Sequence, residues 1–575
     1  QDVVDMTGRA VEAGVKNLVK VTVPEAWKDC TDEELYPKTG NAFVDQIMMP
    51  MNQQEGNTLS VGQLMDQANG TFPSGTTKYE KRGIAVMVPE WQIEHCIQCN
   101  QCASICPHAA IRPVLLTKEE MEKSDVPAKP ALGAKDLYFR IAVSPMDCQG
   151  CRNCIDACPA KENALVAKPL DTQRHLADAW NYFMEDVTPK KNPMNKYTLK
   201  GSQFEKPLLE FSGACAGCGE TPYAKLVTQL FGDRMMIANA SGCSSIWGGS
   251  APSMPYTKNA AGHGPTWANS LFEDNAEYGL GMHLGTQACR KQITDIMTGL
   301  IEEGQISTEL KNAMEDWICH RDEGEGSRER ADRLTDLLEK EKAGNETLEH
   351  LYENKIYFVK RSQWVFGGDG WAYDIGYGGV DHVLAMNRDV NILVFDTEVY
   401  SNTGGQSSKS TPTAAVAKFA ASGKRTKKKD LGMMAMSYGY VYVAQINLGY
   451  DKNQAIKAIK EAEAYPGPSL IICYAPCINH GIKRGMDHSF MEAKAAVECG
   501  YWINYRYNPE LKAEGKKAFF LDSKAPTGDF EAFLRGEVRY ASLEHEFPDV
   551  AKELFKKTKE DAMARRALYE RLDAE

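Results

Sequence analysis

The sequence contains no apolar run of about 18 residues, so a transmembrane helix is excluded. It also lacks an excess of positive charge, because 66 Lys and Arg residues stand against 78 Asp and Glu residues and the net charge is −12. A nucleic-acid-binding protein usually has a basic face, so this balance argues against one. No basic stretch followed by an apolar segment opens the chain, which argues against a signal peptide. We therefore expect a cytoplasmic protein with neither a membrane nor a nucleic acid as its partner.

The chain also lacks a starting methionine, since its first residue is Gln1, and we expect it to begin inside a longer gene product. Its 575 residues are 43% hydrophobic and 25% charged. These are ordinary values for globular proteins, and the length allows several domains.

Cysteine is the most informative residue type, because the chain has 17 of them. Eight lie within 63 residues as two matching motifs, each with two residues between its first three cysteines, three before the fourth, and proline directly after. The members are Cys96, Cys99, Cys102 and Cys106, then Cys148, Cys151, Cys154 and Cys158. This repeat is the signature of bacterial ferredoxins with two clusters.

The spacing predicts how the thiolates are shared between the clusters. Three cysteines two residues apart can bind three irons of one cubane, whereas the fourth lies a helical turn further on and binds the other cluster. We assign Cys96, Cys99, Cys102 and Cys158 to one [4Fe–4S] cluster, the first quartet, and Cys148, Cys151, Cys154 and Cys106 to another, the second quartet. Zinc modules instead use two C-x2-C pairs, and disulfides are disfavoured in a reducing cytosol.

A strand–helix–strand unit is predicted over residues 355–406. An apolar run at 356–366 ends in Gly367-Gly368-Asp369-Gly370, a helical segment follows at 371–386, and a second strand covers 391–396. A polar loop from Thr397 to Gln406 comes next. Such a unit places Asp369 and Thr397 at the carboxyl ends of neighbouring parallel strands, where open α/β sheets bind ligands.

The residues at these two strand ends suit a metal-bound diphosphate. Asp369, the Thr397 hydroxyl and a carbonyl near Val399 are hard oxygen ligands for Mg2+, and the glycines around Asp369 let the backbone approach a phosphate. Gly-Asp-Gly alone is common in turns, but here a polar Thr/Asn loop follows Asp369 by 28 residues. The combination resembles the thiamine diphosphate motif.

A third group of cysteines is dispersed. Cys215 and Cys218 form a C-x2-C pair, and Cys243 follows in Ser241-Gly242-Cys243. Cys473 lies within the apolar run 470–474, where a cysteine is usually a small buried hydrophobe. Cys477 comes after Pro476, past the strand end and on the ligand edge of the sheet. We therefore choose Cys477 as the fourth member of a third quartet. Zinc would suit this set about as well, but the ferredoxin repeat favours a third [4Fe–4S] cluster.

These features together resemble pyruvate:ferredoxin oxidoreductase, the large single-chain 2-oxoacid oxidoreductase of anaerobes. The resemblance rests on the ferredoxin repeat, the third quartet and the stretch "GGDGWAYDIGYGGVDHVLAMNRDVNILVFDTEVYSNTGGQSSKSTPT". The stretches "YEKRGIAVMVPEW" and "GPTWANSLFEDNAEYGLGM" also match. The resemblance covers most of the chain, and the motifs occur in the same order as in the family. It identifies the chain as similar to the C-terminal half of such an enzyme.

The resemblance implies roles for individual residues. Asp369, Thr397 and the carbonyl of Val399 should bind Mg2+. Thiamine diphosphate should be lined by Gly368, Asp369, Gly370, Trp371, Thr397, Glu398, Val399, Tyr400, Ser401 and Asn402. Glu220 and Cys243 should approach the same cofactor, with Glu220 in a positioning role, and Asn402 should face the substrate. The resemblance agrees with the choice of Cys477.

The family has roughly as much sequence again before this point. That half supplies a second thiamine-binding face, the glutamate that activates the cofactor, and most contacts to substrate and coenzyme A. We therefore expect a missing N-terminal half and a homodimer.

The predicted fold is α/β, with a doubly wound thiamine diphosphate-binding domain preceded by an α+β two-[4Fe–4S] ferredoxin-like domain. We expect residues 1–90 to end a preceding domain and form a linker, and 91–170 to be the ferredoxin-like domain. Residues 171–210 are read as a connector, 211–505 as the thiamine domain with the third quartet, and 506–575 as a C-terminal helical tail.

The implied reaction is the oxidative decarboxylation of pyruvate to acetyl-CoA and CO2, in anaerobic metabolism. Three [4Fe–4S] clusters, thiamine diphosphate and Mg2+ are the expected cofactors, and ferredoxin or flavodoxin is the expected acceptor. Two alternatives stay open: a related enzyme for another 2-oxoacid, and an electron-transfer scaffold without thiamine chemistry of its own.

Overall fold

The computed structural model describes residues 2–29 and 38–575, so Cys30 lies outside the described residues. The chain divides into two compact units, Gln1–Asp66 and Gln67–Glu575. Among its described residues, the first unit contains the α-helices α1 (Asp2–Lys16) and α2 (Met49–Asn52) and several short helical turns. The predicted cofactor residues all belong to the second unit.

An eight-stranded sheet forms the centre of the second unit. Its strand order is β13-β12-β10-β11-β9-β8-β6-β7, and the six strands from β10 to β7 run parallel while β12 and β13 are antiparallel additions. The bounds are β6 (Met235–Ala240), β7 (Thr266–Ser270), β8 (Ser362–Gly368), β9 (Asn391–Asp396), β10 (Tyr442–Ile446), β11 (Ser469–Tyr474), β12 (Tyr505–Tyr507) and β13 (Phe519–Leu521).

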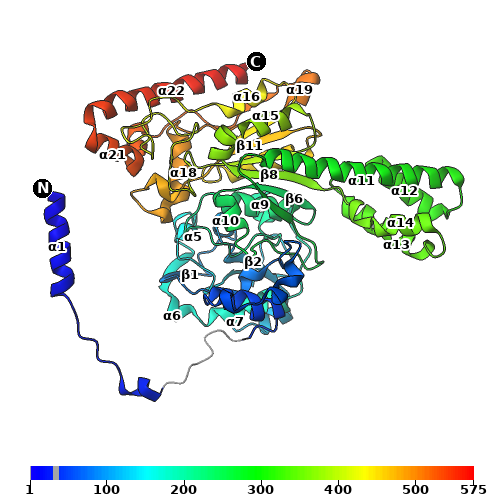
Figure 1. The fold of residues 1–575 in the computed structure, drawn as a ribbon, viewed down its shortest axis with the longest axis horizontal. Coiled ribbons are helices and arrows are strands. Elements are labelled where there is room, and N and C mark those ends of the chain that lie inside the picture. The colour runs from blue at the N-terminus through cyan, green and yellow to red at the C-terminus, as the bar shows by residue number, and fades with distance from the viewer. Residues whose placement is uncertain (1, 30–37) are drawn as a thin grey trace. The chain divides into compact units, whose positions relative to one another are not determined.

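Helices cover both faces of this sheet (Figure 1). Alternate strand residues enter two separate cores: Ile392 and Val394 of β9 join one, and Leu393 and Phe395 join the other. Every residue of β9 and β11 is buried, as expected for parallel strands covered on both sides. The covering helices include α9 (Thr221–Phe231), α10 (Cys243–Gly248), α15 (Tyr377–Ala385), α16 (Leu431–Met436), α17 (Lys452–Ala464) and α18 (Ser489–Glu498). The predicted doubly wound α/β fold is confirmed.

The ferredoxin-like part has two small antiparallel sheets. β1 (Met87–Trp91) pairs with β5 (Leu165–Pro169) across the two cysteine motifs. The segment between the motifs forms a three-stranded sheet in the order β2-β4-β3, with β2 (Ile111–Leu116), β3 (Lys129–Pro130) and β4 (Tyr138–Val143). The short helices of the ferredoxin-like part and of the segment that follows it are α3 (Gln101–Ile105), α4 (Lys118–Glu122), α5 (Asn153–Asp156), α6 (Leu170–Gln173), α7 (Leu176–Asn181) and α8 (Leu199–Ser202).

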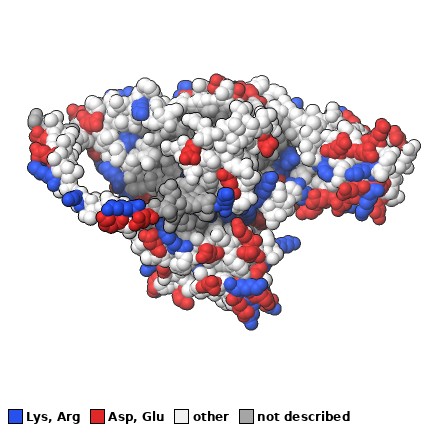
Figure 2. Space-filling view, turned by 60° about the horizontal axis from the view of Figure 1, so that its bottom comes forward, with Lys and Arg blue, Asp and Glu red and all other residues white. Residues whose placement is uncertain are grey.

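A helical arm projects from the sheet and has a hydrophobic core of its own. It consists of α11 (Asn275–Glu303), α12 (Thr308–His320), α13 (Ser327–Glu341) and α14 (Glu346–Glu353). Figure 2 shows a dense distribution of Asp and Glu along this arm. Phe358 and Val359 pack into the arm core, which is why the strand predicted from residue 356 begins only at Ser362.

The C-terminal segment contributes to the same core as the sheet. Phe519, Phe530, Tyr540 and Tyr569 lie in one hydrophobic cluster with Val394 of β9. The helices of this segment are α19 (Pro509–Ala513), α20 (Phe530–Gly536), α21 (Val538–Glu546) and α22 (Pro548–Ala574). None of the helices in the described part of the chain combines the length and apolar content needed to cross a bilayer.

Candidate functional site

The two ferredoxin-like motifs fold into loops of the same shape. Gln98 and Asn100 have positive φ angles of 56° and 63°, and the residues at the matching positions, Gly150 and Arg152, have 70° and 61°. The backbone N–H of Gln98 donates to Cys96 Sγ at 3.4 Å, and that of Gly150 donates to Cys148 Sγ at 3.4 Å. Such hydrogen bonds to sulfur are typical of iron–sulfur loops.

The fourth cysteine of each motif lies near thiols of the other motif. Burial and the thiols of Cys99, Cys96 and Cys158 raise the pKa of Cys102, so Cys158 lies with the first quartet. Burial raises the pKa of Cys151, to about 11, with Cys106 contributing next, so Cys106 lies with the second quartet. Every cysteine in the described ranges is a free thiol.

No three His, Cys, Asp or Glu side chains among the described residues are placed to hold one metal ion together. A cubane does not require such an arrangement, because each of its irons binds its own thiolate. The convergent free thiols and their N–H donors fit this group.

The third quartet comes from three separate parts of the fold. Cys215 and Cys218 lie in the turn before α9, Cys243 begins α10, and Cys477 follows β11. Burial, Glu220, and the thiols of Cys218 and Cys477 raise the pKa of Cys243, while Cys215 contributes to the raised pKa of Cys477. The four predicted members are therefore neighbours.

Gly219 explains how the Cys218 and Cys477 loops come so close. Its N–H donates to the carbonyl of Pro476 at 3.1 Å, and a Cβ at this position would lie 2.5 Å from the Pro476 nitrogen. Cys473 is different, since it is fully buried within β11 among core side chains.

We expect Cys477→Ser to remove one cluster, so that the iron content of the protein falls from about twelve to about eight per chain. Cys473→Ser is the control: it buries a hydroxyl in the core, which costs about 1–3 kcal/mol in stability but leaves the iron in place. Anaerobic iron and sulfide analysis measures both. Equal iron contents in the two variants would contradict the choice of Cys477.

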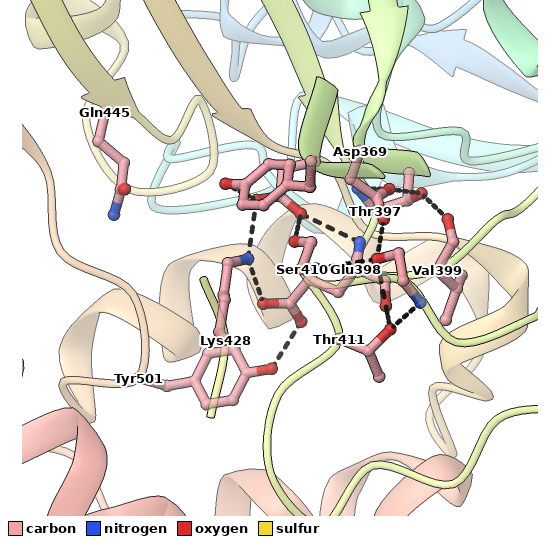
Figure 3. Close-up of polar contacts among 12 residues, drawn as sticks. Asp369, Thr397, Glu398, Val399, Ser410, Thr411, Lys428, Gln445 and Tyr501 are labelled. Carbon is pink, nitrogen blue, oxygen red and sulfur yellow. Dashed lines mark hydrogen bonds and ion pairs between the residues drawn. The ribbon is translucent and has the colours of Figure 1, made fainter. Parts of the chain in front are cut away.

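The predicted magnesium ligands meet at one corner of the sheet (Figure 3). Asp369 Oδ1 accepts from the Thr397 hydroxyl at 3.0 Å, and that hydroxyl lies 3.1 Å from the carbonyl oxygen of Val399. Asp369 Oδ2 accepts from the Ser408 hydroxyl at 2.6 Å. Burial and the neighbouring carboxylate of Asp396 raise the pKa of Asp369 well above its ordinary value. The three oxygens fit Mg2+.

The loop of residues 397–406, here named the cofactor loop, closes over Gly370. A Cβ at Gly370 would lie 2.5 Å from the ring of Tyr400, so only glycine fits at this approach. Trp371 is fully buried in the core, and its indole packs against Gly367 and Gly376. Asn402 is exposed, and Ser401 Oγ lies 3.1 Å from Cys243 Sγ.

Glu220 lies beside the third quartet, directly before α9. Its Oε2 accepts from Trp247 Nε1 at 2.7 Å, and burial raises the pKa of Glu220 to about 7. The negative charge of Glu220 contributes to the raised pKa values of the Cys218, Cys243 and Cys477 thiols. The structure thus places Glu220 beside the third quartet.

Glu398 points away from the magnesium corner into a buried ion-pair network. It accepts from Lys428 at 2.9 Å, Arg539 at 2.9 Å and the Tyr501 hydroxyl at 2.6 Å. Burial opposes its ionisation, but Lys428 and Arg539 outweigh burial and lower the pKa of Glu398 to about 2. Its positive φ of 60° is held by these contacts.

Several residues of this site could not be recognised in the sequence. Ser408 donates to Asp369, and His480 lies 2.7 Å from the Thr397 carbonyl. His480 belongs to no motif, and Ser408 lies in the matched stretch without a role assigned to it. Lys428 lies in a run of basic residues (424–429), yet its side chain is only 9% exposed and pairs with Asp396 and Glu398. These three side chains are recognised as part of the site only through their contacts with segments that are distant in the sequence.

Comparison with known families assigns three segments. Residues 355–473 match the C-terminal TPP binding domain of thiamine pyrophosphate enzymes, and residues 95–161 match a 4Fe-4S dicluster domain. Residues 31–85 match a domain of unknown function. The first match contains Asp369, Thr397 and Val399, and the second contains the two ferredoxin-like motifs.

Relatives match the chain along its whole length. It is 61% identical over 576 residues to a pyruvate-flavodoxin oxidoreductase of Klebsiella pneumoniae, covering 100% of this chain and 49% of the relative. It is 53% identical over 580 residues to a pyruvate:ferredoxin oxidoreductase of Moorella thermoacetica, covering 99% and 49%. The chain spans about half the length of the curated relatives it matches. The resemblance drawn from the motifs is confirmed.

A solved structure, the 2-oxoglutarate:ferredoxin oxidoreductase from Magnetococcus marinus, also matches. The match has a TM-score of 0.28 at 14% identity and covers 47% of this chain and 65% of that one.

Proposed function

We propose that this chain, which resembles pyruvate-flavodoxin and pyruvate:ferredoxin oxidoreductases along its whole length, carries the thiamine and iron–sulfur part of such an enzyme. The reaction would be the oxidative decarboxylation of pyruvate to acetyl-CoA and CO2. Electrons would pass through the third quartet, then the first and second quartets, to ferredoxin or flavodoxin. The protein would act as a homodimer.

One contact carries this proposal most directly. Ser401 of the cofactor loop lies 3.1 Å from Cys243 of the third quartet, and Thr397 of the same loop contacts Asp369. The residues proposed to hold the diphosphate and those proposed to hold a cluster therefore belong to one continuous site. Electron transfer from a decarboxylated substrate to a cluster requires such proximity.

The residues have distinct tasks in this proposal. Asp369, Thr397 and the Val399 carbonyl would hold Mg2+, and Gly370 would admit the diphosphate to the backbone. When bound, thiamine diphosphate supplies the electron sink for decarboxylation. Glu220 would position the cofactor beside the third quartet, and Asn402, exposed on the cofactor loop, would face the 2-oxoacid.

The chain contains one thiamine-binding segment, whereas the cofactor of such enzymes normally lies between two domains. The glutamate that activates the cofactor and most coenzyme A contacts would come from the other half of the length seen in the relatives. Glu220 is a poor substitute, because it faces the third quartet.

We therefore expect residues 1–575, loaded with iron, sulfide, Mg2+ and thiamine diphosphate, to be reducible by dithionite but inert with pyruvate and coenzyme A. Adding the other half should restore pyruvate-dependent reduction of ferredoxin or flavodoxin, followed by absorbance. Robust turnover by residues 1–575 alone would contradict the proposal that the other half is needed for activity.

The same assay separates the alternatives when it is run on the complete protein. Preference for 2-oxoglutarate or an aryl pyruvate over pyruvate would identify a related oxidoreductase with another substrate. Full cluster content without thiamine diphosphate binding would instead identify an electron-transfer scaffold.

A further inference from the structure

The segment after β11 lies against the cofactor loop, which follows the neighbouring strand β9. Two side chains of this segment reach the loop backbone. His480 Nε2 lies 2.7 Å from the carbonyl oxygen of Thr397, and Asn479 Nδ2 donates to the carbonyl of Ser401 at 3.1 Å. The loop is thus held at two points by residues that follow Cys477 within three positions.

Asn479 contacts the third quartet with the same amide group. Its Nδ2 lies 3.6 Å from Cys477 Sγ, and its backbone N–H lies 3.5 Å from the same sulfur. Gly405, at the far end of the loop, passes close to this side chain, since a Cβ there would lie 3.3 Å from Asn479 Oδ1. One amide therefore joins the Ser401 carbonyl to a proposed cluster ligand.

Ser401 makes a second connection in the opposite direction. Its hydroxyl lies 3.1 Å from Cys243 Sγ, and either atom can donate in the free protein. A thiolate bound to iron has no proton to give, so the Ser401 hydroxyl becomes the donor once a cluster is present. Two sulfurs of the third quartet, Cys477 and Cys243, would then each accept a side-chain hydrogen bond from this pair.

Hydrogen bonds to ligand sulfur stabilise the reduced state of a cluster, because that state carries one more negative charge. Removing a donor therefore makes the reduction potential more negative. Positioning of the cofactor loop depends on the same atoms, because the Asn479 amide also holds the Ser401 carbonyl.

We propose that Asn479 and Ser401 form a hydrogen-bonded link that positions the cofactor loop on the third quartet and raises the reduction potential of its cluster. The inference rests on the proposed function and adds two positioning residues to it. The link couples the placement of the two cofactors, since neither loop can shift without breaking a contact to the other.

Variants of Asn479 test the effect on the cluster. In the anaerobically purified holoprotein, Asn479→Ala should shift the midpoint potential of one cluster to a more negative value and leave the other two unchanged. Asn479→Asp keeps the shape but replaces the donor by a carboxylate, so its shift should be larger. Redox titration followed by electron paramagnetic resonance measures this. Asn345→Ala, which removes the cap of α14 in the helical arm, is the matched control and should shift none.

Variants of Ser401 test whether both residues act on the same cluster. Ser401→Ala should shift the signal that Asn479→Ala shifts, and Ser401→Thr, which keeps the hydroxyl, should restore it. The dissociation constant of thiamine diphosphate should rise about fivefold in Asn479→Ala, the change expected for one lost hydrogen bond.

The outcomes separate this inference from the function on which it rests. Unchanged potentials in Asn479→Ala, Asn479→Asp and Ser401→Ala, with iron content intact, would overturn the link alone. Shifts in different clusters for the two residues would also overturn it. An unmodified protein with about eight irons, or without thiamine diphosphate binding, would overturn the proposed function and the link together.

Discussion

Asp369→Ala is expected to weaken binding of thiamine diphosphate with Mg2+ by several kcal/mol, because it removes the carboxylate that we assign to Mg2+. In the same variant the buried Ser408 hydroxyl would lose its hydrogen bond to Asp369, and the Thr397 hydroxyl would keep the Val399 carbonyl as its acceptor. Calorimetric titration of the cofactor into the anaerobic protein measures the change. Iron content should stay at about twelve per chain, since no quartet includes this residue.

Two further variants separate charge from packing at this corner. Asp369→Asn keeps the size and some hydrogen bonding but removes the charge, so it should weaken binding nearly as much as Asp369→Ala. Asp374→Ala is the matched control, because Asp374 lies on η8 (Gly370–Ile375), the short helix that begins directly after Asp369, but pairs with Lys409 at 2.7 Å. Equal cofactor affinity in Asp369→Ala and Asp374→Ala would show that the site is misplaced.

Arg539→Ala is expected to lower the free energy of unfolding by about 3–5 kcal/mol, because it leaves buried carboxylates without their cation. Arg539 contacts Glu537 at 2.7 Å and Glu398 at 2.9 Å, and all three side chains are at most 2% exposed. Glu398 adjoins Thr397 and Val399, so release of its side chain should also loosen the cofactor loop. Denaturant unfolding, with hydrogen exchange of the loop, measures both effects.

Arg535 supplies the control for this prediction. It pairs with Glu544 and Glu531 on the surface, where its side chain is 44% exposed. Arg535→Ala should therefore change stability by about 1 kcal/mol or less. Arg539→Lys should be more stable than Arg539→Ala, because lysine keeps the positive charge although it lacks the planar guanidinium group. Equal stabilities of Arg535→Ala and Arg539→Ala would refute the importance of the buried network.

Local patterns predicted the elements that carry the site, because their causes are local. The strand predicted at 391–396 is observed as β9 with the same bounds, since its four central residues are apolar and face both sides of the sheet. The helix predicted at 371–386 was less accurate. It is observed as η8 followed by α15, and Gly376 packs against the Trp371 indole between them. That packing depends on tertiary contacts, which periodicity does not record.

The sequence by itself was enough to predict the cysteine motifs, their proposed exchange between two clusters, the proposed magnesium ligands and the choice of Cys477. Ligand spacing within a loop and the end of a parallel strand are short-range properties, so a few residues are enough to specify them. Only the tertiary structure decided that Ser401 meets Cys243, that Asn479 bridges two loops, and that Lys428 and Arg539 turn inward to Glu398. These contacts join segments that are distant in the chain, and β9, β11 and the C-terminal helices bring them together by burying apolar surface that no single segment could bury alone.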